Sequence, residues 1–321
     1  MQASATDLDI ELKVYYAGVN RWKHAEIADK VVAFKADYLV MYPVRGHARY
    51  LLETMEKAKI KTLFINTDIY SGDKEIFGSP RDKFKYWIGH IFPDDRQAGY
   101  DLADFLIRAA EKKKLYNKDR KIELIGISGA HESNAAIFRN EGLNQAVKDH
   151  KQNLHQILFA KWKRQKATDA TLKLIQRYPD TQVFWAASDS MSLGIIDAIE
   201  KMKKTPGQTI ITGGVDWMPG ALSAVRSGKM TATMGGHFME GGWAMVFLHD
   251  YHNGRDFSES EGVTMNSKMG VIHEGNVEKY YQYFKTGNWD KIDFKQFSKI
   301  YNPKIKKYDF SLEAVLQSVD K

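Results

Sequence analysis

The sequence predicts an α/β protein with two doubly wound parallel-sheet domains. Its 321 residues are enough for two domains of ordinary size. Strand patterns alternate with helix patterns along most of the chain, which is typical of parallel sheets that carry helices on both faces. Several strand patterns are nearly continuous apolar runs, as expected for strands buried on both faces. Nine or more strands divide naturally into two such sheets.

The first series of elements extends from the N-terminus to residue 113. It begins with residues 1–7, which resemble the last two turns of an amphipathic helix. Asp94 and Asp95 suit the positive N-terminal end of the last helix in the series. Strands are expected at residues 10–18, 36–43, 61–68 and 86–92, and helices at residues 21–35, 47–58 and 94–113.

A second series starts at residue 121. Asp189 is the predicted N-cap of one of its helices, Pro219 suits the first turn of another, and Asn253 with Gly254 ends a third. Strands are expected at 121–129, 155–162, 181–188, 208–216 and 230–236, and helices at 133–150, 167–179, 189–204, 218–228 and 239–254. Beyond residue 255 the pattern is less regular, with one strand within 262–272 and a helix near 276–284.

The composition is that of a soluble globular protein, with 43% hydrophobic and 27% charged residues. The net charge of +7 comes from scattered lysines, which indicates a solvated basic surface rather than a nucleic-acid site. No stretch approaches the roughly 20 apolar residues of a membrane span, and the N-terminal residues lack the pattern of a signal peptide. The absence of cysteine excludes disulfides, thiolate metal sites and cysteine nucleophiles.

The common phosphate-binding and catalytic motifs are missing from the sequence. No strand is followed by G-x-G-x-x-G, and G-x-x-x-x-G-K-[ST], G-x-S-x-G and H-E-x-x-H are not found. His249 and His252 share a helix end, but the ten histidines show no metal-ligand spacing. We therefore expect no cofactor, no metal site and no catalytic residues.

Polar and aromatic residues follow the strands at their carboxyl ends. In doubly wound sheets, ligands bind beyond these ends, where the strand order reverses. These positions are therefore candidate binding residues. They are Asn66, Thr67, Asp68, Ser128, Trp162, Ser188, Asp189, Asp216, Trp217, Gly236 and His237.

Four segments, in the correct order, resemble motifs of a known family. They are residues 94–106, 138–147, 183–199 and 211–233. The segment at 183–199 resembles the helix start A-x-N-D-x-M-A-x-G-A, and that at 211–233 resembles a run that begins G-x-D-x-x-P. The family is that of the type I periplasmic binding proteins, which are similar to ribose-binding protein and share their fold with the ligand-binding cores of lactose-repressor-type regulators.

The resemblance implies two doubly wound lobes joined by a three-strand hinge that closes over a ligand. It places residues 1–93 and 237–268 in the N-terminal lobe, and residues 94–236 and 269–321 in the C-terminal lobe. It finds no counterpart for the family's first strand and most of its first helix. We therefore expect an exposed apolar edge on the N-terminal sheet, weak or no ligand binding, and poor solubility or self-association.

The resemblance also implies ligand-binding residues. Asn66, Arg139 and Asp216 match polar ligand-binding positions of the family, and Trp162 matches an aromatic residue that stacks on a sugar ring. A surface helix arginine and a core tryptophan are the structural alternatives for Arg139 and Trp162. The remaining candidates are Asp68; Ser188 and Asp189, where the family has an asparagine before an aspartate; and His237, near the place of a family glutamine.

The function that the resemblance implies is capture of a small polar ligand, a sugar, for an ABC transporter permease or a sensor kinase in the periplasm. No nucleic acid partner is expected. A lactose-repressor-type regulator core is an alternative, and so is a receptor for a furanosyl borate autoinducer, since that subgroup shares Arg139 and the "FIN" at residues 64–66. A third alternative is an enzyme, with an acid–base site built from Asp68, Asp94, Asp95 and His237. We do not expect it, because nothing in the sequence sets the geometry of these residues.

Overall fold

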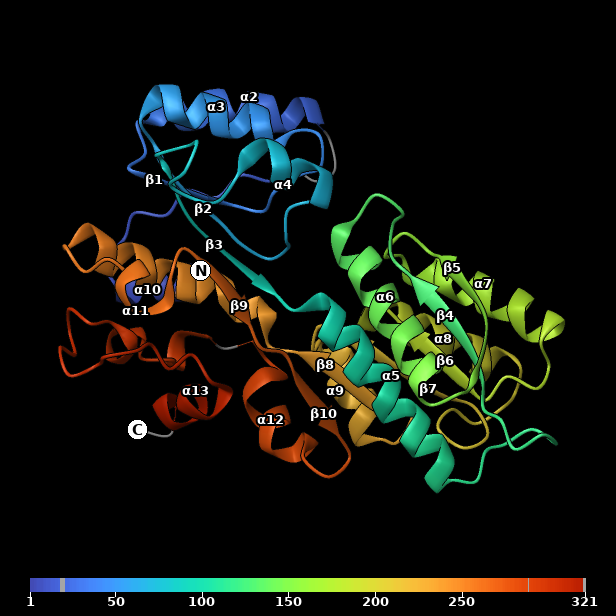
Figure 1. The fold of residues 1–321 in the computed structure, drawn as a ribbon. Helices are drawn as coiled ribbons and strands as arrows, with labels where there is room; N and C mark the ends of the chain where they lie inside the picture. Colours follow the sequence, from blue (N-terminus) through green and yellow to red (C-terminus); the bar gives the residue numbers. More distant parts are fainter. Residues whose placement is uncertain (18–20, 288, 320–321) are drawn as a thin grey trace. The chain divides into compact units, whose positions relative to one another are not determined.

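A computed structural model of the chain describes residues 1–17, 21–287 and 289–319 (Figure 1). The chain forms two compact units, each with its own sheet. Unit 1 comprises Met1–Pro93, His237–Ser267 and Trp289–Lys321. Unit 2 comprises Asp94–Gly236 and Lys268–Asn288. The chain therefore passes between the units after Pro93, Gly236 and Ser267, and once more at the start of the last section of unit 1.

Each unit contains one largely parallel sheet. Among the described residues, the sheet of unit 1 has the order β1 (Tyr38–Met41), β2 (Lys61–Phe64), β3 (Trp87–Pro93), β9 (Thr264–Ser267), all parallel. The sheet of unit 2 has the order β10 (Gly270–His273), β8 (Ala232–Gly235), β7 (Ile211–Val215), β6 (Val183–Ala186), β4 (Glu123–Ser128), β5 (Asn153–Phe159). Of the strands that the structure describes in this sheet, β10 alone runs antiparallel to its neighbour. The predicted fold class is confirmed.

Helices join the strands in both units. Unit 1 contains α1 (Gln2–Asp7), α2 (Arg21–Phe34), α3 (Ala48–Ala58), α4 (Ser71–Phe77), α10 (Glu240–His252), α11 (Ser258–Glu261) and α13 (Leu312–Val319), with 3-10 turns at His237–Met239, Trp289–Lys291 and Phe294–Phe297. Unit 2 contains α5 (Asp95–Lys112), α6 (Asn134–Asp149), α7 (Arg164–Arg177), α8 (Asp189–Lys201), α9 (Pro219–Arg226) and α12 (Val277–Phe284).

The sheet of unit 1 is covered on both faces because adjacent residues of a strand point to opposite sides. Phe64 of β2 packs with residues of α3 and α4. Its neighbour Leu63 packs with α10 and the C-terminal segment. In Figure 1, α2, α3 and α4 lie on one side of β1 and β2, and α10 lies on the other. Both residues are fully buried, as the apolar run predicts.

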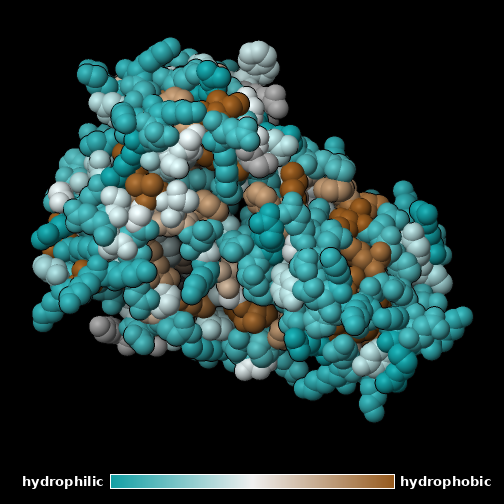
Figure 2. All heavy atoms as spheres, viewed as in Figure 1, coloured by the Kyte–Doolittle hydropathy of each residue, from teal (hydrophilic) through white to brown (hydrophobic). Residues whose placement is uncertain are grey.

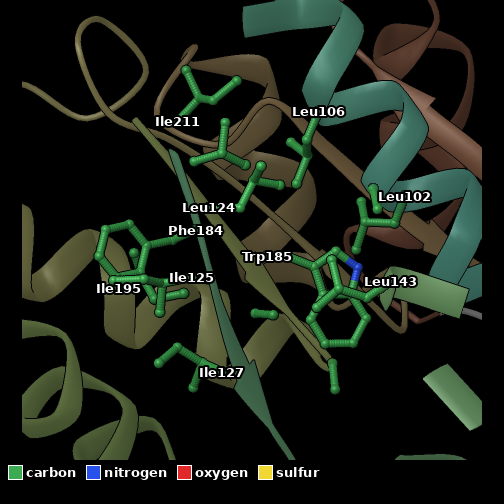
Figure 3. Packing of buried hydrophobic residues seen from close by; sticks show 14 of the residues in the cluster. Leu102, Leu106, Leu124, Ile125, Ile127, Leu143, Phe184, Trp185, Ile195 and Ile211 are labelled. Carbon is green, nitrogen blue, oxygen red and sulfur yellow. The ribbon is translucent and has the colours of Figure 1, made fainter. Parts of the chain in front are cut away.

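The core of unit 2 follows the same rule. Trp185 lies near Leu102 and Leu124 near Leu106, both of α5, whereas Phe184 and Ile125 lie on the side of Ile195 of α8 (Figure 3). The indole nitrogen of Trp185 donates to the carbonyl oxygen of Gly99 at 3.2 Å, so its one polar atom is satisfied inside the core. Two helix layers therefore enclose a sheet whose central strands are buried on both faces.

Two predicted strands differ from the structure. Residues 10–17 form no strand, and residue 18 lies outside the described residues. Instead of pairing, residues 8–17 and the strand β1 both line one cavity of about 1020 Å³ within unit 1. The single strand expected within 262–272 is two strands, β9 and β10, because the chain passes from unit 1 to unit 2 between Ser267 and Lys268.

The C-terminal segment also differs from its predicted assignment. Residues 289–319 belong to unit 1 rather than to the C-terminal lobe, and Lys268 belongs to unit 2. The reason is the buried Asp250 of α10, which accepts hydrogen bonds from the Ser298 hydroxyl, the Lys299 backbone N–H and the Tyr308 hydroxyl. Polar groups of the segment therefore bind within the core of unit 1.

The surface carries mostly polar side chains. Hydrophilic residues cover most of the face shown in Figure 2, with apolar residues in small patches between them. Within the described part of the chain, every helix is too short or too polar to span a bilayer.

Candidate functional site

Arg139 is the centre of a polar cluster in unit 2. It lies on α6 with only 4% of its surface exposed. Its Nε donates to Asp95 Oδ1 at 2.7 Å, and one terminal nitrogen donates to the carbonyl oxygen of Ala187 at 2.7 Å. The same nitrogen lies 3.9 Å from Asp216 Oδ1. Arg139 therefore joins the N-terminus of α5 to the residues that follow β6 and β7, and it is not a surface helix arginine.

Close packing of α5 against α6 places Arg139 at this position. A Cβ at Gly142 would lie 2.0 Å from the Arg96 carbonyl oxygen, and one at Gly99 would lie 2.2 Å from the Arg139 carbonyl oxygen. Any side chain at either position would push the helices apart. These are the glycines of the segments "RQAGY" and "RNEGL", so both motifs have a structural reason.

Asp216 follows β7 in an uncommon backbone conformation, with φ of 134°. Its backbone N–H donates to Met234 of β8 at 2.7 Å, which fixes the turn. Burial raises the pKa of Asp216 above its ordinary value, and the charge of Asp95 adds to this, although the Arg139 guanidinium opposes it. The side chain remains 32% exposed, so its carboxyl group is accessible to a ligand.

Asp189 is fully buried beside Asp216. Its carboxylate accepts the Met218 backbone N–H at 2.9 Å and the Thr233 hydroxyl at 2.7 Å. Burial raises the pKa of Asp189, and the charge of Asp216 raises it further. The two hydrogen bonds and the charge of Arg139 lower this pKa, but by less. The prediction that Asp189 caps α8 is wrong, because Ser188 is the N-cap and its hydroxyl accepts the Met191 N–H. The N-cap residue precedes the helix and has an extended backbone, which lets its side chain accept a backbone N–H of the first turn. Ser188 has this conformation, whereas Asp189 is already helical.

Trp162 follows β5 with φ of 62° and is partly buried against the core of unit 2. Its ring lies against the backbone of Gly129, where a Cβ would be 2.1 Å away. Trp217, in contrast, is buried and stacks on Tyr280. Of the two tryptophans after strands, Trp162 is the more accessible.

The predicted residues of unit 2 therefore lie together at one edge of its sheet. A guanidinium with three neighbouring carboxyl groups offers paired donors and acceptors, and an accessible indole offers a flat apolar surface. Pairs of hydroxyl groups bind well to such planar charged groups, and sugar C–H faces pack on aromatic rings. Asp95, which we predicted only to favour the helix N-terminus, is part of this cluster.

Two predicted residues of unit 1, Asn66 and His237, line the cavity of about 1020 Å³ within that unit. Asn66 follows β2 with φ of 74°, and its backbone N–H donates to Glu240 Oε2 at 2.6 Å. Tyr42, just after β1, lines the same cavity. The strand predicted at residues 36–43 ends next to Tyr42, but Tyr42 is not among the binding residues predicted from the sequence.

Asp68 is engaged locally instead. Its carboxylate accepts the Ile69 N–H at 2.7 Å and pairs with Lys74 of α4 at 2.5 Å. It is not among the residues that line the cavity. Nearby, His90 of β3 is buried, which lowers its pKa to about 4, and its Nε2 donates to the Thr67 carbonyl oxygen at 2.9 Å. The neutral His90 therefore braces the turn that contains Asn66.

Four candidate residues other than glycine share a backbone feature. Asn66, Trp162, Asp216 and Trp217 all have positive φ, and each lies shortly after the end of a parallel strand. Such conformations are uncommon in residues other than glycine and concentrate at ligand sites, where surrounding contacts hold them. Across the ranges 1–17, 21–287 and 289–319, no group of three or more His, Asp or Glu side chains is arranged to hold a metal ion.

Comparison with known proteins places this geometry in context. The family model described as periplasmic binding protein domain matches residues 1–256. The chain is 32% identical over 147 residues to the ribose import binding protein of Haemophilus influenzae, an alignment that covers 46% of either chain. The chain thus aligns with about half the length of this relative.

Solved structures are similar over a larger part of the chain. A periplasmic sugar-binding protein from Pseudomonas fluorescens has 28% identity and a TM-score of 0.87, with 98% of this chain and 93% of that chain covered. The binding component of the arabinose ABC transporter from Shewanella sp. ANA-3 has 19% identity, a TM-score of 0.75 and 89% coverage of both chains, a likeness of fold. With the family match over residues 1–256, this chain belongs to the periplasmic binding protein domain family.

Proposed function

We propose that this chain is a solute-binding protein that captures a small neutral sugar for an ABC transporter. The observation that carries the proposal is the Arg139 cluster at the carboxyl ends of the strands of unit 2, in a chain of the periplasmic binding protein family. Similar proteins support it, since one is a ribose import binding protein and the structure of another was solved with bound arabinofuranose.

The charges of the cluster favour a neutral ligand. Asp95 and Asp216 already offset the single positive charge of Arg139, and Asp189 adds a third carboxyl group nearby. An anionic sugar would meet the accessible carboxyl group of Asp216, with Asp95 paired to Arg139 behind it, and like charges repel strongly in a partly buried site. A neutral polyol can instead donate to the carboxylates and accept from the guanidinium.

The partner that we propose is a membrane permease, reached from the periplasm. A sensor kinase could read the same ligand-bound state. Cross-linking in membranes that contain the permease, with and without sugar, distinguishes the two readers.

A thermal-shift screen of pentoses, hexoses, polyols and sugar acids, on protein expressed from its complete reading frame, tests the proposed function. We expect a neutral sugar to raise the melting temperature and a uronic acid not to do so. Calorimetry with that sugar then compares Arg139→Lys, which keeps the charge but loses the planar fork, with the parent chain. We expect about tenfold weaker binding, since a charge-assisted hydrogen bond contributes roughly 1.5–3 kcal/mol.

The matched control is Arg108→Ala. Arg108 is an exposed arginine of α5 in the same unit, and it pairs with its own helix neighbour Asp104. We expect the control to bind sugar as the parent does. Asn66→Ala tests unit 1 in the same way. Equal sugar affinity in the parent and Arg139→Lys would remove Arg139 from the site.

A further inference from the structure

We propose that Glu240 is a positioning residue that sets ligand affinity by holding the backbone of Asn66. The inference rests on the proposed function, because Asn66 matters to affinity only if unit 1 binds the sugar. Glu240 borders the same cavity as Asn66 but is only 1% exposed, so we assign its effect to the Asn66 backbone that it holds. Nothing in the sequence had indicated this role.

The geometry of Glu240 is that of a buried double acceptor. It is the first residue of α10 and is 1% exposed. One oxygen accepts the Asn66 N–H at 2.6 Å, and the other accepts the Ser267 hydroxyl. An ionised carboxylate accepts with both oxygens, and a helix N-terminus stabilises a negative charge. The side chain is therefore suited to both bonds at once.

Asn66 needs such support because of its backbone. Its φ of 74° lies in the left-handed region, which asparagine adopts more readily than most residues but which is still uncommon, so contacts that hold it select one conformation of the turn. The Glu240 bond holds the N–H side of this turn, and the bond from His90 to the Thr67 carbonyl oxygen holds the other side. A ligand that binds a turn held in place pays less ordering entropy than one that must order the turn.

The second bond of Glu240 extends its influence to the ends of two strands. Ser267 is the last residue of β9, and it pairs with Pro93, the last residue of β3. Both are the final residues of unit 1 before the chain continues into unit 2. Glu240 thus connects the turn at Asn66 to two of the points where the chain leaves unit 1.

The test combines a local probe with a binding measurement on the full chain. In ¹⁵N-labelled protein without sugar, the Asn66 amide proton should move upfield in Glu240→Ala, because its carboxylate acceptor is lost. In Glu240→Gln the side chain can still accept from Asn66 and donate to Ser267, so the resonance should move less. An Asn66 amide that is unaffected by Glu240→Ala would overturn the inference, whether or not any sugar binds.

Affinity for the sugar found in the screen provides the second readout. We expect at least about tenfold weaker binding in Glu240→Ala and substantial rescue in Glu240→Gln. The matched control is Asp250→Asn, a second buried acid of α10 that binds the C-terminal segment. It should lower the melting temperature without weakening sugar binding. Equal losses of affinity in Asp250→Asn and Glu240→Ala would reduce Glu240 to a purely structural residue. If no sugar binds the parent chain, the proposed function fails, and the amide shift still decides whether Glu240 holds Asn66.

Discussion

Individual buried charges dominate unit 2 at the scale of single residues. Asp95 and Arg139 form a pair that is almost fully buried, at 1% and 5% side-chain exposure. Removing one partner of such a pair leaves the other charge without compensation, which typically costs about 3–5 kcal/mol. Asp189 and Asp216 share the same surroundings, and burial raises the pKa of both. The cluster therefore carries carboxyl groups that are held closer to neutrality than exposed ones.

This arrangement predicts how the stability of Asp189→Asn depends on pH. The folded-state pKa of Asp189 lies above its unfolded value, so the folded chain binds the extra proton and its stability falls as pH rises through that interval. Asparagine keeps the acceptor for Met218 and cannot ionise. The stability of the variant relative to the parent should therefore improve from about pH 4 to about pH 9. Urea unfolding at several pH values measures it, and a difference that is constant with pH would contradict the raised pKa.

At the scale of elements, the contact between α5 and α6 positions the site. The two helices approach so closely at Gly99 and Gly142 that backbone meets backbone. Arg139 lies one helical turn before Gly142, and Asp95 lies one turn before Gly99, so this contact brings the two charges together. The separation of the two helices thus sets the length of the ion pair.

We predict that Gly142→Ala destabilises the chain by about 3 kcal/mol, because overpacking against backbone cannot be relieved by a rotamer change. It should also weaken sugar binding, since Arg139 moves with α6. Urea unfolding and calorimetry measure the two effects. Gly220→Ala is the control, because its Cβ would approach only the end of the Leu193 side chain, at 3.3 Å. A well-folded Gly142→Ala variant with parental stability would show that the helices can separate at little cost.

At the scale of the whole molecule, the C-terminal segment completes the core of unit 1. Trp243 of α10 stacks on Phe310 with ring centroids 4.3 Å apart and planes 4° apart. The Tyr308 hydroxyl donates to the buried Asp250 at 2.8 Å. Burial is the main cause that raises the pKa of Tyr308, and this hydrogen bond is the second. The hydroxyl therefore remains a donor at neutral pH. The segment therefore contributes to the stability of a unit whose first residue is more than 280 positions away from it.

Tyr308→Phe should lower the free energy of unfolding by about 1–3 kcal/mol, because Asp250 loses a donor while the ring contacts remain. Chemical denaturation monitored by tryptophan fluorescence measures the change. Tyr301→Phe, at an exposed tyrosine of the same segment, should leave stability nearly unchanged. Equal effects of the two substitutions would mean that the bond to Asp250 contributes nothing beyond a surface hydroxyl.

The sequence by itself determined the fold class and the candidate set for unit 2. Hydrophobic periodicity is a local property, so strands such as 183–186 and the residues that follow them could be predicted from neighbouring positions alone. Because parallel strands end at one edge of a sheet, Trp162 and Asp216 could be expected near one another. Arg139 lies on a helix, and only the resemblance to the family indicated it. Asp189 was chosen correctly as a residue of that edge, although its role as an N-cap was wrong.

The tertiary structure alone decided which distant segments meet. The bond between Asn66 and Glu240 joins residues 174 positions apart, and that between Asp250 and Tyr308 joins residues 58 positions apart. No local pattern encodes either bond, because each depends on how helices and strands pack after they form. The same holds for residues 10–17, whose strand pattern is strong. A strand needs a partner backbone for its hydrogen bonds. In unit 1, residues 10–17 have no paired strand and line a cavity, which the local sequence could not indicate.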